Sequence, residues 1–268
     1  TARIFFTSGS TGVPKGVPSS YRNLQAAASN LLDMFASLAV AEEPPVFLDW
    51  LPWHHALGGV LNLGRSVLLG ATHYIDDGKP LPGMFERTVR NLREVSPTVL
   101  TSVPSAWSML AVELERDPQL AKSVFARVIN FGYGGASLPK DVNERIQRVA
   151  ERTVGERIVF ATGLAATETT GVGTYRTWAS DDLGNIGAPA PGTELKLVPL
   201  EGDRYEIRVR GAHNFAGYVA RPDLTQAAFD DEGFFKLGDA VRLVDRADPT
   251  QGMRFDGRVA EDFKLVNG

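Results

Sequence analysis

The chain has 268 residues, of which 43% are hydrophobic and 22% charged, with a net charge of −4; this is the composition of a globular protein that can bury a sizeable core. The mild negative charge lacks the basic footprint that nucleic acids and anionic membranes attract, and no apolar run reaches transmembrane length, so we expect neither a nucleic-acid partner nor membrane insertion. The absence of cysteine excludes disulfides, thiolate metal sites and a cysteine nucleophile, and it agrees with a cytoplasmic location.

Strands and helices are predicted to alternate along the first part of the chain. A short strand at 3–6 is followed by a Gly/Ser-rich loop at 7–16 and by a helix that Ser19 or Ser20 can cap. Hydrophobic periodicity predicts further strands at 44–52, 71–75, 98–103, 127–131 and 157–161, and helices at 60–69, 82–96, 105–116 and 140–152. This alternation indicates an α/β fold with a parallel, helix-covered sheet.

The pattern changes near Gly184, where the Gly/Pro-rich sequence GNIGAPAPG interrupts it. Alternating residues then predict strands around 194–197 and 205–210, with one short helix after Arg221 and Pro222. We therefore expect an α/β part at 1–183 and a small β-barrel-like part at 184–268. Because the chain begins at Thr1 within a strand pattern and ends at Gly268 within a motif, we interpret it as an excised piece.

The segment TSGSTGVPKG at 7–16 has the chemistry of a polyphosphate-binding loop. Its glycines let backbone N–H groups approach phosphate oxygens, its hydroxyls add donors, and Lys15 adds a positive charge. It is not a Walker loop, because Gly16 stands where that motif needs a serine or threonine to hold magnesium, and this disfavours a P-loop kinase or NTPase. The alternative interpretation is a flexible surface turn.

Four later segments occur in an order that, together with this loop, resembles the adenylate-forming superfamily of acyl- and aryl-CoA synthetases, luciferases and adenylation domains. They are YGGASLP at 133–139, TGLAATET at 162–169, KLGDA at 236–240 and DGRVAEDFKLVNG at 256–268. The segments LDWLPWHH, YIDDGKP, NLREVSPTV and FDGRVAEDFKLVNG look most like bacterial feruloyl-CoA synthases. The resemblance implies part of the large N-terminal domain of a ligase that uses ATP, Mg²⁺ and CoA to activate a hydroxycinnamate-like acid.

The resemblance also implies roles for individual residues. Lys15, Thr167 and Glu168 would be catalytic: the Thr167 hydroxyl would reach the α-phosphate and Glu168 would hold Mg²⁺. Asp239 and Arg258 would bind the ribose, whose two vicinal hydroxyls match the two acceptor oxygens of a carboxylate. The residues implied for ATP or AMP are Thr7, Ser8, Gly9, Ser10, Thr11, Gly12, Lys15, Gly134, Gly135, Ala136, Leu164, Asp239 and Arg258. The residues predicted for the acyl pocket, from their places beside the motifs, are Trp53, His55, Val103, Tyr133 and Gly163.

Three positions depart from the family pattern. Leu164 stands where many members stack a tyrosine on adenine, so the contact would be apolar without aromatic stacking. Ala165 replaces a neighbouring glycine, and Ala260 stands where many members carry a charged hinge residue. These departures leave the adenine contact and the hinge chemistry open.

The first reaction step needs no general base, because a carboxylate is already ionised at neutral pH. Catalysis would depend on alignment and on stabilisation of charge. The family's C-terminal domain, with a second lysine and the CoA tunnel, would follow Gly268, so we expect the fragment alone to turn over poorly. Two alternatives remain: an adenylating enzyme that passes its acyl group to a carrier protein, and a non-catalytic nucleotide-binding module. The sequence leaves the acid and the oligomeric state open.

Overall fold

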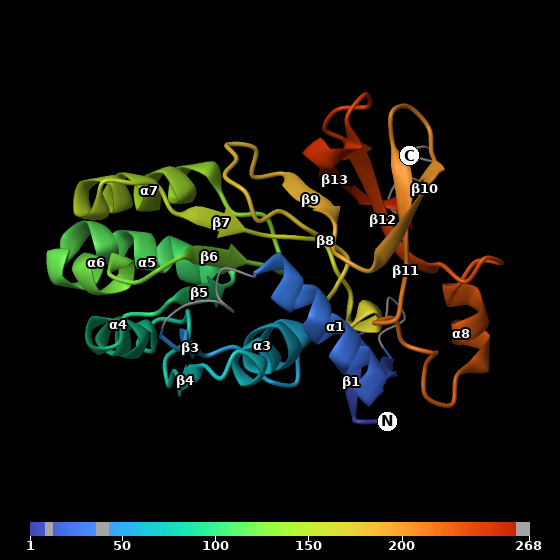
Figure 1. Cartoon of the computed structure of the whole chain (residues 1–268), viewed down its shortest axis with the longest axis horizontal. Helices are drawn as coiled ribbons and strands as arrows, with labels where there is room; N and C mark the ends of the chain where they lie inside the picture. The colour runs from blue at the N-terminus through green and yellow to red at the C-terminus, as the bar shows by residue number, and fades with distance from the viewer. Residues whose placement is uncertain (9–12, 36–42, 261–268) are drawn as a thin grey trace.

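The computed structural model describes residues 1–8, 13–35 and 43–260, which form a five-stranded sheet with helices around it, a six-stranded sheet and a two-stranded hairpin (Figure 1). Helices α4–α7 gather at one end of the molecule, antiparallel strands β9–β13 lie at the other, and helix α1 (Tyr21–Met34) crosses between them. The predicted change from an α/β part to a β-rich part is therefore visible in the arrangement of the chain.

The first sheet is parallel and has five strands in the order β4-β3-β5-β6-β7. The strands are β4 (Thr72–Ile75), β3 (Val46–Asp49), β5 (Val99–Ser102), β6 (Asn130–Tyr133) and β7 (Val159–Ala161). Each neighbouring pair runs in parallel, which requires a crossover between paired strands. The prediction of a parallel, helix-covered sheet is confirmed.

Both faces of this sheet are covered, because successive residues of a strand point to opposite faces. Leu48, Leu100, Phe131 and Phe160 pack in one core with helices on the first face: α4 (Phe85–Glu94), α5 (Pro104–Arg116), α6 (Pro118–Phe125) and α7 (Lys140–Val154). Their chain neighbours Phe47, Val99 and Ala161 pack on the other face with Leu31 and Phe35 of helix α1 and its end. Segment η1 (Leu57–Asn62) and helix α3 (Leu63–Leu68) contact helix α1. In the described ranges, no helix combines the length and apolar character needed to cross a bilayer.

The second sheet is antiparallel, with six strands in the order β10-β11-β12-β13-β9-β8. They are β10 (Thr193–Pro199), β11 (Tyr205–Gly211), β12 (Phe235–Leu243), β13 (Met253–Arg258), β9 (Asn185–Pro189) and β8 (Thr174–Tyr175). The short segments η2 (Thr167–Thr169) and η3 (Pro249–Gln251) and helix α8 (Pro222–Ala228) lie in the connections before and between these strands. The expectation of a β-rich second part is confirmed. Sheet membership changes already at Thr174, whereas the division at 183/184 stays a prediction.

The polyphosphate-loop prediction for 7–16 needs a correction in its geometry. The segment does not run from a strand directly to a helix: β1 (Arg3–Ser8) and β2 (Pro14–Ser19) form an antiparallel hairpin, and Lys15 lies on β2 opposite Thr7. Two prolines in six residues argue against a strand. However, only every second residue of an antiparallel strand exchanges hydrogen bonds with its partner, and Pro14 and Pro18, four residues apart, can both occupy positions whose N–H is not needed. Val17 between them is fully buried and fixes the register.

Helix α1 begins as predicted at Ser20. The Ser20 Oγ accepts a hydrogen bond from the backbone N–H of Asn23 at 3.1 Å, and the Asn23 Oδ1 accepts one from the Ser20 N–H at 2.9 Å. This reciprocal capping satisfies two of the backbone donors that the start of a helix leaves unpaired. It fixes the helix directly after the hairpin, whose buried residues Phe5 and Val17 pack in the core of the antiparallel sheet.

Candidate active site

A cavity of about 530 Å³ lies between the parallel sheet and the segments α1, η1 and α3. The sheet contributes alternate residues of three strands and of the loops after them: Thr101, Val103, Asn130, Gly132, Gly134, Ala161 and Gly163. Within a strand every second residue points to this face, and Gly134 leaves room, since a Cβ there would make only ordinary contacts with Leu57. The cavity reaches the carboxyl ends of the strands, where open α/β sheets bind their ligands.

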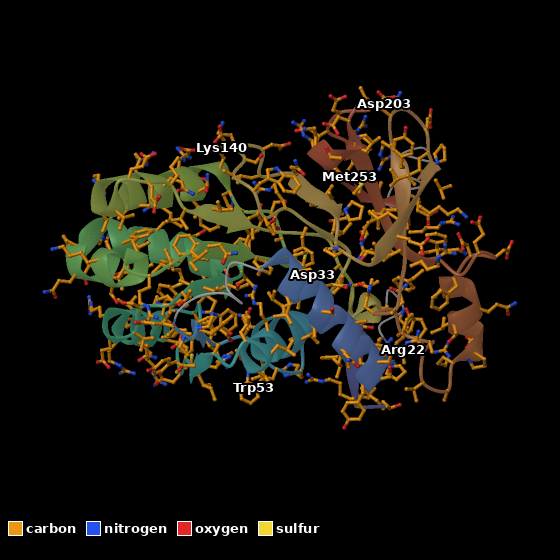
Figure 2. The ribbon with its side chains drawn as sticks, in the orientation of Figure 1. Arg22, Asp33, Trp53, Lys140, Asp203 and Met253 are labelled. Carbon is orange, nitrogen blue, oxygen red and sulfur yellow. The ribbon has the colours of Figure 1, made fainter. Side chains whose placement is uncertain are left out.

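Four of the five residues predicted for the acyl pocket line this cavity: His55, Val103, Tyr133 and Gly163. Trp53 does not. Its side chain is 43% exposed at the outer edge of the molecule (Figure 2), and its carbonyl oxygen accepts a hydrogen bond from Arg3 Nη2 at 2.7 Å. The turn that begins the helical segment points this side chain outward, so the geometry does not support a place for Trp53 in the acyl pocket.

Gly163 meets a packing requirement besides lining the cavity. A Cβ at this position would overlap the carbonyl oxygen of Thr174, whereas a Cβ at Gly134 would make only ordinary 3.6 Å contacts with Leu57. We expect Gly163→Ala to lower the free energy of unfolding by about 1–3 kcal/mol, the usual cost of overpacking. Gly134→Ala, the matched control, should change it by less than about 1 kcal/mol. Urea unfolding of both variants checks this, and equal effects would contradict it.

Lys15 and Glu168, far apart in the sequence, meet on the two sides of Tyr218. The Lys15 Nζ lies 4.7 Å from the centroid of the Tyr218 ring, and the Tyr218 hydroxyl donates a hydrogen bond to Glu168 Oε1 at 2.7 Å. Burial, together with the negative charge of Glu168, raises the pKa of Tyr218, so the phenol keeps its proton and remains a donor. The hairpin and the Thr-Glu motif therefore share one place, as the polyphosphate interpretation requires.

Tyr218 belongs to this cluster although sequence reasoning missed it. It lies in the segment NFAGYVA, outside every motif, and no spacing connects it to Lys15 or Glu168. Its ring contacts Phe215 at 4.8 Å, and its backbone N–H donates to Thr225 Oγ1. Only the folded chain shows that an aromatic ring separates the ammonium from the carboxylate.

The remaining residues predicted for ATP lie in different surroundings. Thr167, Gly134 and Gly135 line the cavity, and Gly135 has a φ of +84°, a conformation that glycine adopts without strain. Ala136 and Leu164 do not line it; Leu164 packs against the core of the antiparallel sheet. The Thr7 hydroxyl oxygen is buried without a hydrogen-bond partner among the described residues.

Four residues of the predicted loop, Gly9, Ser10, Thr11 and Gly12, fall outside the described residues, and of Ser8 only the backbone is described, at the end of β1. The structure therefore fixes the two strands that carry the loop. The predicted phosphate contacts of the loop itself stay a prediction.

Asp239 and Arg258 form an ion pair between neighbouring strands β12 and β13, with 3.1 Å between Oδ1 and Nη1. Asp239 is buried, whereas the Arg258 side chain is 56% exposed. Burial raises the pKa of Asp239 to about 6, because loss of water around the carboxylate outweighs the attraction of Arg258. The pair lies outside the residues that line the cavity, so its predicted contact with ribose stays a prediction.

The cavity wall also includes polar residues that were not predicted, among them Asn62, Arg65, Asn130 and Tyr175. Arg65 lies in the mostly apolar segment predicted as a buried helix at 60–69. A charged residue in such a helix is the one sequence signal that could have singled it out, because a fully buried arginine needs partners.

A magnesium site built by the protein alone is not present in the part of the chain that the structure describes, where no three acidic or histidine side chains converge. Glu168 nonetheless fits the usual protein contribution, since Mg²⁺ is commonly held by one or two carboxylates together with substrate phosphates and water. Its carboxylate and the Lys15 ammonium both contact Tyr218, so phosphates held by Lys15 would lie near Glu168.

The fold and the site define an α/β protein with a ligand cavity at the carboxyl edge of a parallel sheet, next to a lysine-bearing hairpin. The model of the family of AMP-binding enzymes matches residues 1–219, and the chain belongs to this family. The resemblance to adenylate-forming enzymes is thereby confirmed.

Curated relatives and solved structures agree with this assignment. The chain is 28% identical to the mitochondrial malonate–CoA ligase of Mus musculus over 91% of this chain and 46% of that protein. It is 29% identical to the luciferin 4-monooxygenase of Photinus pyralis over 89% of this chain and 42% of that protein. A solved malonyl-CoA ligase with methylmalonyl-CoA and AMP bound has a TM-score of 0.76 and 32% identity, covering 95% of this chain and 52% of that one.

The chain spans about half the length of the curated relatives it matches. The proteins named above include a malonate–CoA ligase and a malonyl-CoA ligase but no feruloyl-CoA synthase. The coarse prediction, a part of an adenylate-forming enzyme, is confirmed, while the finer resemblance to feruloyl-CoA synthases remains a hypothesis about the acid.

Proposed function

We propose that the protein activates a carboxylic acid with ATP and transfers it to CoA. The acid's carboxylate attacks the α-phosphorus of ATP, the bond to the β-phosphate oxygen breaks, and acyl-AMP and pyrophosphate form. The CoA thiol then attacks the acyl carbon, loses its proton and displaces AMP. The observation that carries this proposal is the meeting of Lys15, Tyr218 and Glu168 beside a ligand cavity in a chain of the AMP-binding family.

Each part of the site has a role in this proposal. The Lys15 ammonium and the hairpin loop stabilise the charge of the phosphates, and the Thr167 hydroxyl donates to the α-phosphate. Glu168 holds Mg²⁺, which neutralises phosphate charge when it is bound. Gly134, Gly135, Ala136 and Leu164 border the adenine, and Asp239 with Arg258 binds the ribose. Tyr218 keeps the Glu168 carboxylate in place through its hydrogen bond.

For the acid we propose an aromatic, hydroxycinnamate-like molecule that enters the cavity beyond Tyr133. Two arguments support it: the resemblance of several sequence motifs to those of feruloyl-CoA synthases, and cavity walls that are largely apolar, with Leu31, Phe35 and Leu61 among them. A malonate-type diacid is the second candidate, because relatives at 26–28% identity are named malonate–CoA ligases. A cavity of about 530 Å³ lies in the range that small-molecule sites occupy.

Product analysis with the full-length protein tests the function. ATP and a panel of hydroxycinnamates, benzoates and diacids should give AMP and pyrophosphate, and a thioester only when CoA is present. ADP or free phosphate would indicate a kinase or NTPase, and no product would indicate a binding module. A thioester formed on a carrier phosphopantetheine but not on free CoA would indicate a carrier-loading enzyme.

Residues 1–268 alone are expected to bind nucleotide and acid with little turnover, because we propose that the domain with the second lysine and the CoA tunnel lies outside them. Pyrophosphate exchange by this chain and by the full-length protein compares the two directly. Equal rates would contradict this part of the proposal. A cytoplasmic location also stays a proposal, since relatives include a protein named as mitochondrial.

Nucleoside binding should weaken as the pH falls through about 6. Asp239 is ionised above that value and then offers both oxygens to the ribose, whereas protonation removes one acceptor. Adenosine is the suitable probe, because it carries no phosphate that titrates in this range. Calorimetric titration between pH 5 and 8 should show the loss, and Asp239→Asn should bind weakly with no such pH dependence; a wild-type affinity that is constant over this range would contradict the ribose role.

The raised pKa of Asp239 also determines how this residue changes the stability of the fold with pH. Its folded-state pKa lies above the unfolded value of 3.8, so the folded state binds more protons between these two values. Asp239 therefore favours the folded state increasingly as the pH falls from about 6 toward 4. A loss of adenosine binding in this range is thus not caused by Asp239 destabilising the fold.

A further inference from the structure

The Arg65 guanidinium is buried in the cavity wall with most of its donors unused. The residue is 5% exposed and lines the cavity. Among the described residues its side chain makes one hydrogen bond, from Nη2 to Asn62 Oδ1 at 3.4 Å, and its Nε has no partner. A guanidinium carries five N–H donors, and buried donors are normally satisfied. This arginine, which lines the cavity, is therefore short of acceptors among the described residues.

No carboxylate of the described residues lies within 4.0 Å of the Arg65 nitrogens. Asp49, whose charge acts on Arg65, is already occupied: its Oδ1 accepts from the backbone N–H of Leu51 and its Oδ2 from Asn62 Nδ2. Burial lowers the pKa of Arg65 to about 10, so it remains charged at neutral pH. The guanidinium is held instead by aromatic rings, 4.7 Å from the centroid of Phe35 and 5.1 Å from that of Phe47.

Strand register places Phe47, a ring partner of Arg65, toward the end of the cavity remote from the carboxyl edge. Phe47 pairs with Val99, and Val99 pairs with Asn130, so all three occupy one row at the start of the strands. Gly134 and the loop toward Thr167 lie at the other end. The four residues from Asn130 to Gly134 correspond to about 13 Å at about 3.3 Å per residue. An acid whose carboxylate lies at that edge must be long to reach this row.

Asn130 adds a second unused polar group in the same row. Its side-chain oxygen is buried without a partner, and its amide makes no side-chain hydrogen bond among the described residues. Arg65 can donate and the Asn130 amide can accept or donate. Together they suit an oxygen-bearing group on the acid. A diacid whose two carboxylates are attached to the same carbon is too short to reach from the carboxyl edge of the sheet to Arg65 and Asn130.

We propose that Arg65 determines the specificity of the protein by donating hydrogen bonds to an oxygen acceptor at the far end of the acid, opposite the carboxylate that reacts. This rests on the proposed function and refines it: the acid is extended and carries a ring hydroxyl or a second carboxylate at that end. A guanidinium that lacks acceptors in the free protein gains them from such an acid. An acid without the acceptor leaves these donors buried and unpaired, which disfavours its binding.

The test uses three acids of the same shape with the full-length protein: 4-hydroxycinnamate, 4-carboxycinnamate and unsubstituted cinnamate. Wild-type protein should favour at least one of the first two over cinnamate in kcat/KM, and the larger gain identifies the acceptor as hydroxyl or carboxylate. Arg65→Gln should lower kcat/KM for the favoured acid about 10- to 100-fold, as expected for hydrogen bonds to a charged group. It should leave cinnamate within about threefold, and most of the change should be in KM.

Arg65→Lys, which keeps the charge but not the planar fork, should restore part of the preference. Arg87→Gln, on the exposed surface of helix α4, is the matched control and should change nothing. Wild-type protein that treats the three acids alike would overturn the proposal without any variant. A preference that persists unchanged in a folded Arg65→Gln protein would overturn it as well.

Equilibrium binding separates this inference from the proposed function. If no acid yields AMP and pyrophosphate, the ligase proposal fails, but calorimetric titration of the same three acids still measures whether Arg65 discriminates among them. If turnover occurs but the affinities for the three acids do not depend on the acceptor group at their far end, the ligase proposal stands and the proposed role of Arg65 is wrong.

Discussion

Replacing Lys15 with alanine is expected to lower the rate of acyl-AMP formation by about 100- to 1,000-fold in the full-length protein, the usual cost of removing one group that stabilises the transition state. The Lys15 ammonium is a positive charge of the hairpin, and its Nζ lies 4.7 Å from the centroid of the Tyr218 ring, whose hydroxyl donates to Glu168. The loss should be in kcat more than in the KM for the acid, because charge on the phosphates grows during the reaction. Pyrophosphate exchange measures it.

Stability should change little in this variant. Lys15 makes no ion pair among the described residues, and a partly exposed cation against one ring contributes about 0.5–1 kcal/mol. Lys140→Ala is the matched control, since Lys140 lies on the outer surface at the start of helix α7 (Figure 2); it should leave the rate unchanged. A Lys15→Ala protein that keeps its rate would remove the central reason for the ATP assignment.

Replacing Trp107 with alanine is expected to lower the free energy of unfolding by about 3–5 kcal/mol, the range for truncating a large buried aromatic residue. Trp107 is 1% exposed beneath the strands that carry the cavity. Its ring lies 4.8 Å from that of Phe131 and 4.9 Å from that of Phe160, and its Nε1–H donates to the carbonyl of Gly132 at 3.0 Å. Truncation leaves a cavity and also removes this hydrogen bond to the carbonyl on strand β6.

Trp53→Ala is the matched control, because it removes the same side chain from a position that is 43% exposed. We expect a change below about 1 kcal/mol there. Urea unfolding followed by far-ultraviolet circular dichroism compares the two without depending on tryptophan fluorescence. Similar urea midpoints for the two variants would contradict the proposal that the core between the parallel sheet and helices α4–α7 supports the strands that line the cavity.

Much of the architecture was predictable because its signals are local. Runs such as 98–103 and 127–131 predicted strands, and the 3.6-residue periodicity of 140–152 predicted a helix, since burial of one face repeats along the chain. The hairpin strand β2 was missed for the opposite reason: its two prolines and Gly16 carry no strand signal, and only pairing with β1 makes it a strand. Strand β8 and helix α6 were also not predicted separately, because short elements give weak periodicity.

The sequence by itself determined the family, the order of α/β and β-rich parts, and the residue types suited to ATP, because glycines, hydroxyls, a lysine and single carboxylates at characteristic places are properties of the chain alone. Only the tertiary structure decided that Tyr218 lies between Lys15 and Glu168, that Trp53 points outward, and that Arg65 faces the cavity. These are contacts between residues distant in sequence. They depend on how sheets and helices pack, and no local periodicity or motif records that packing.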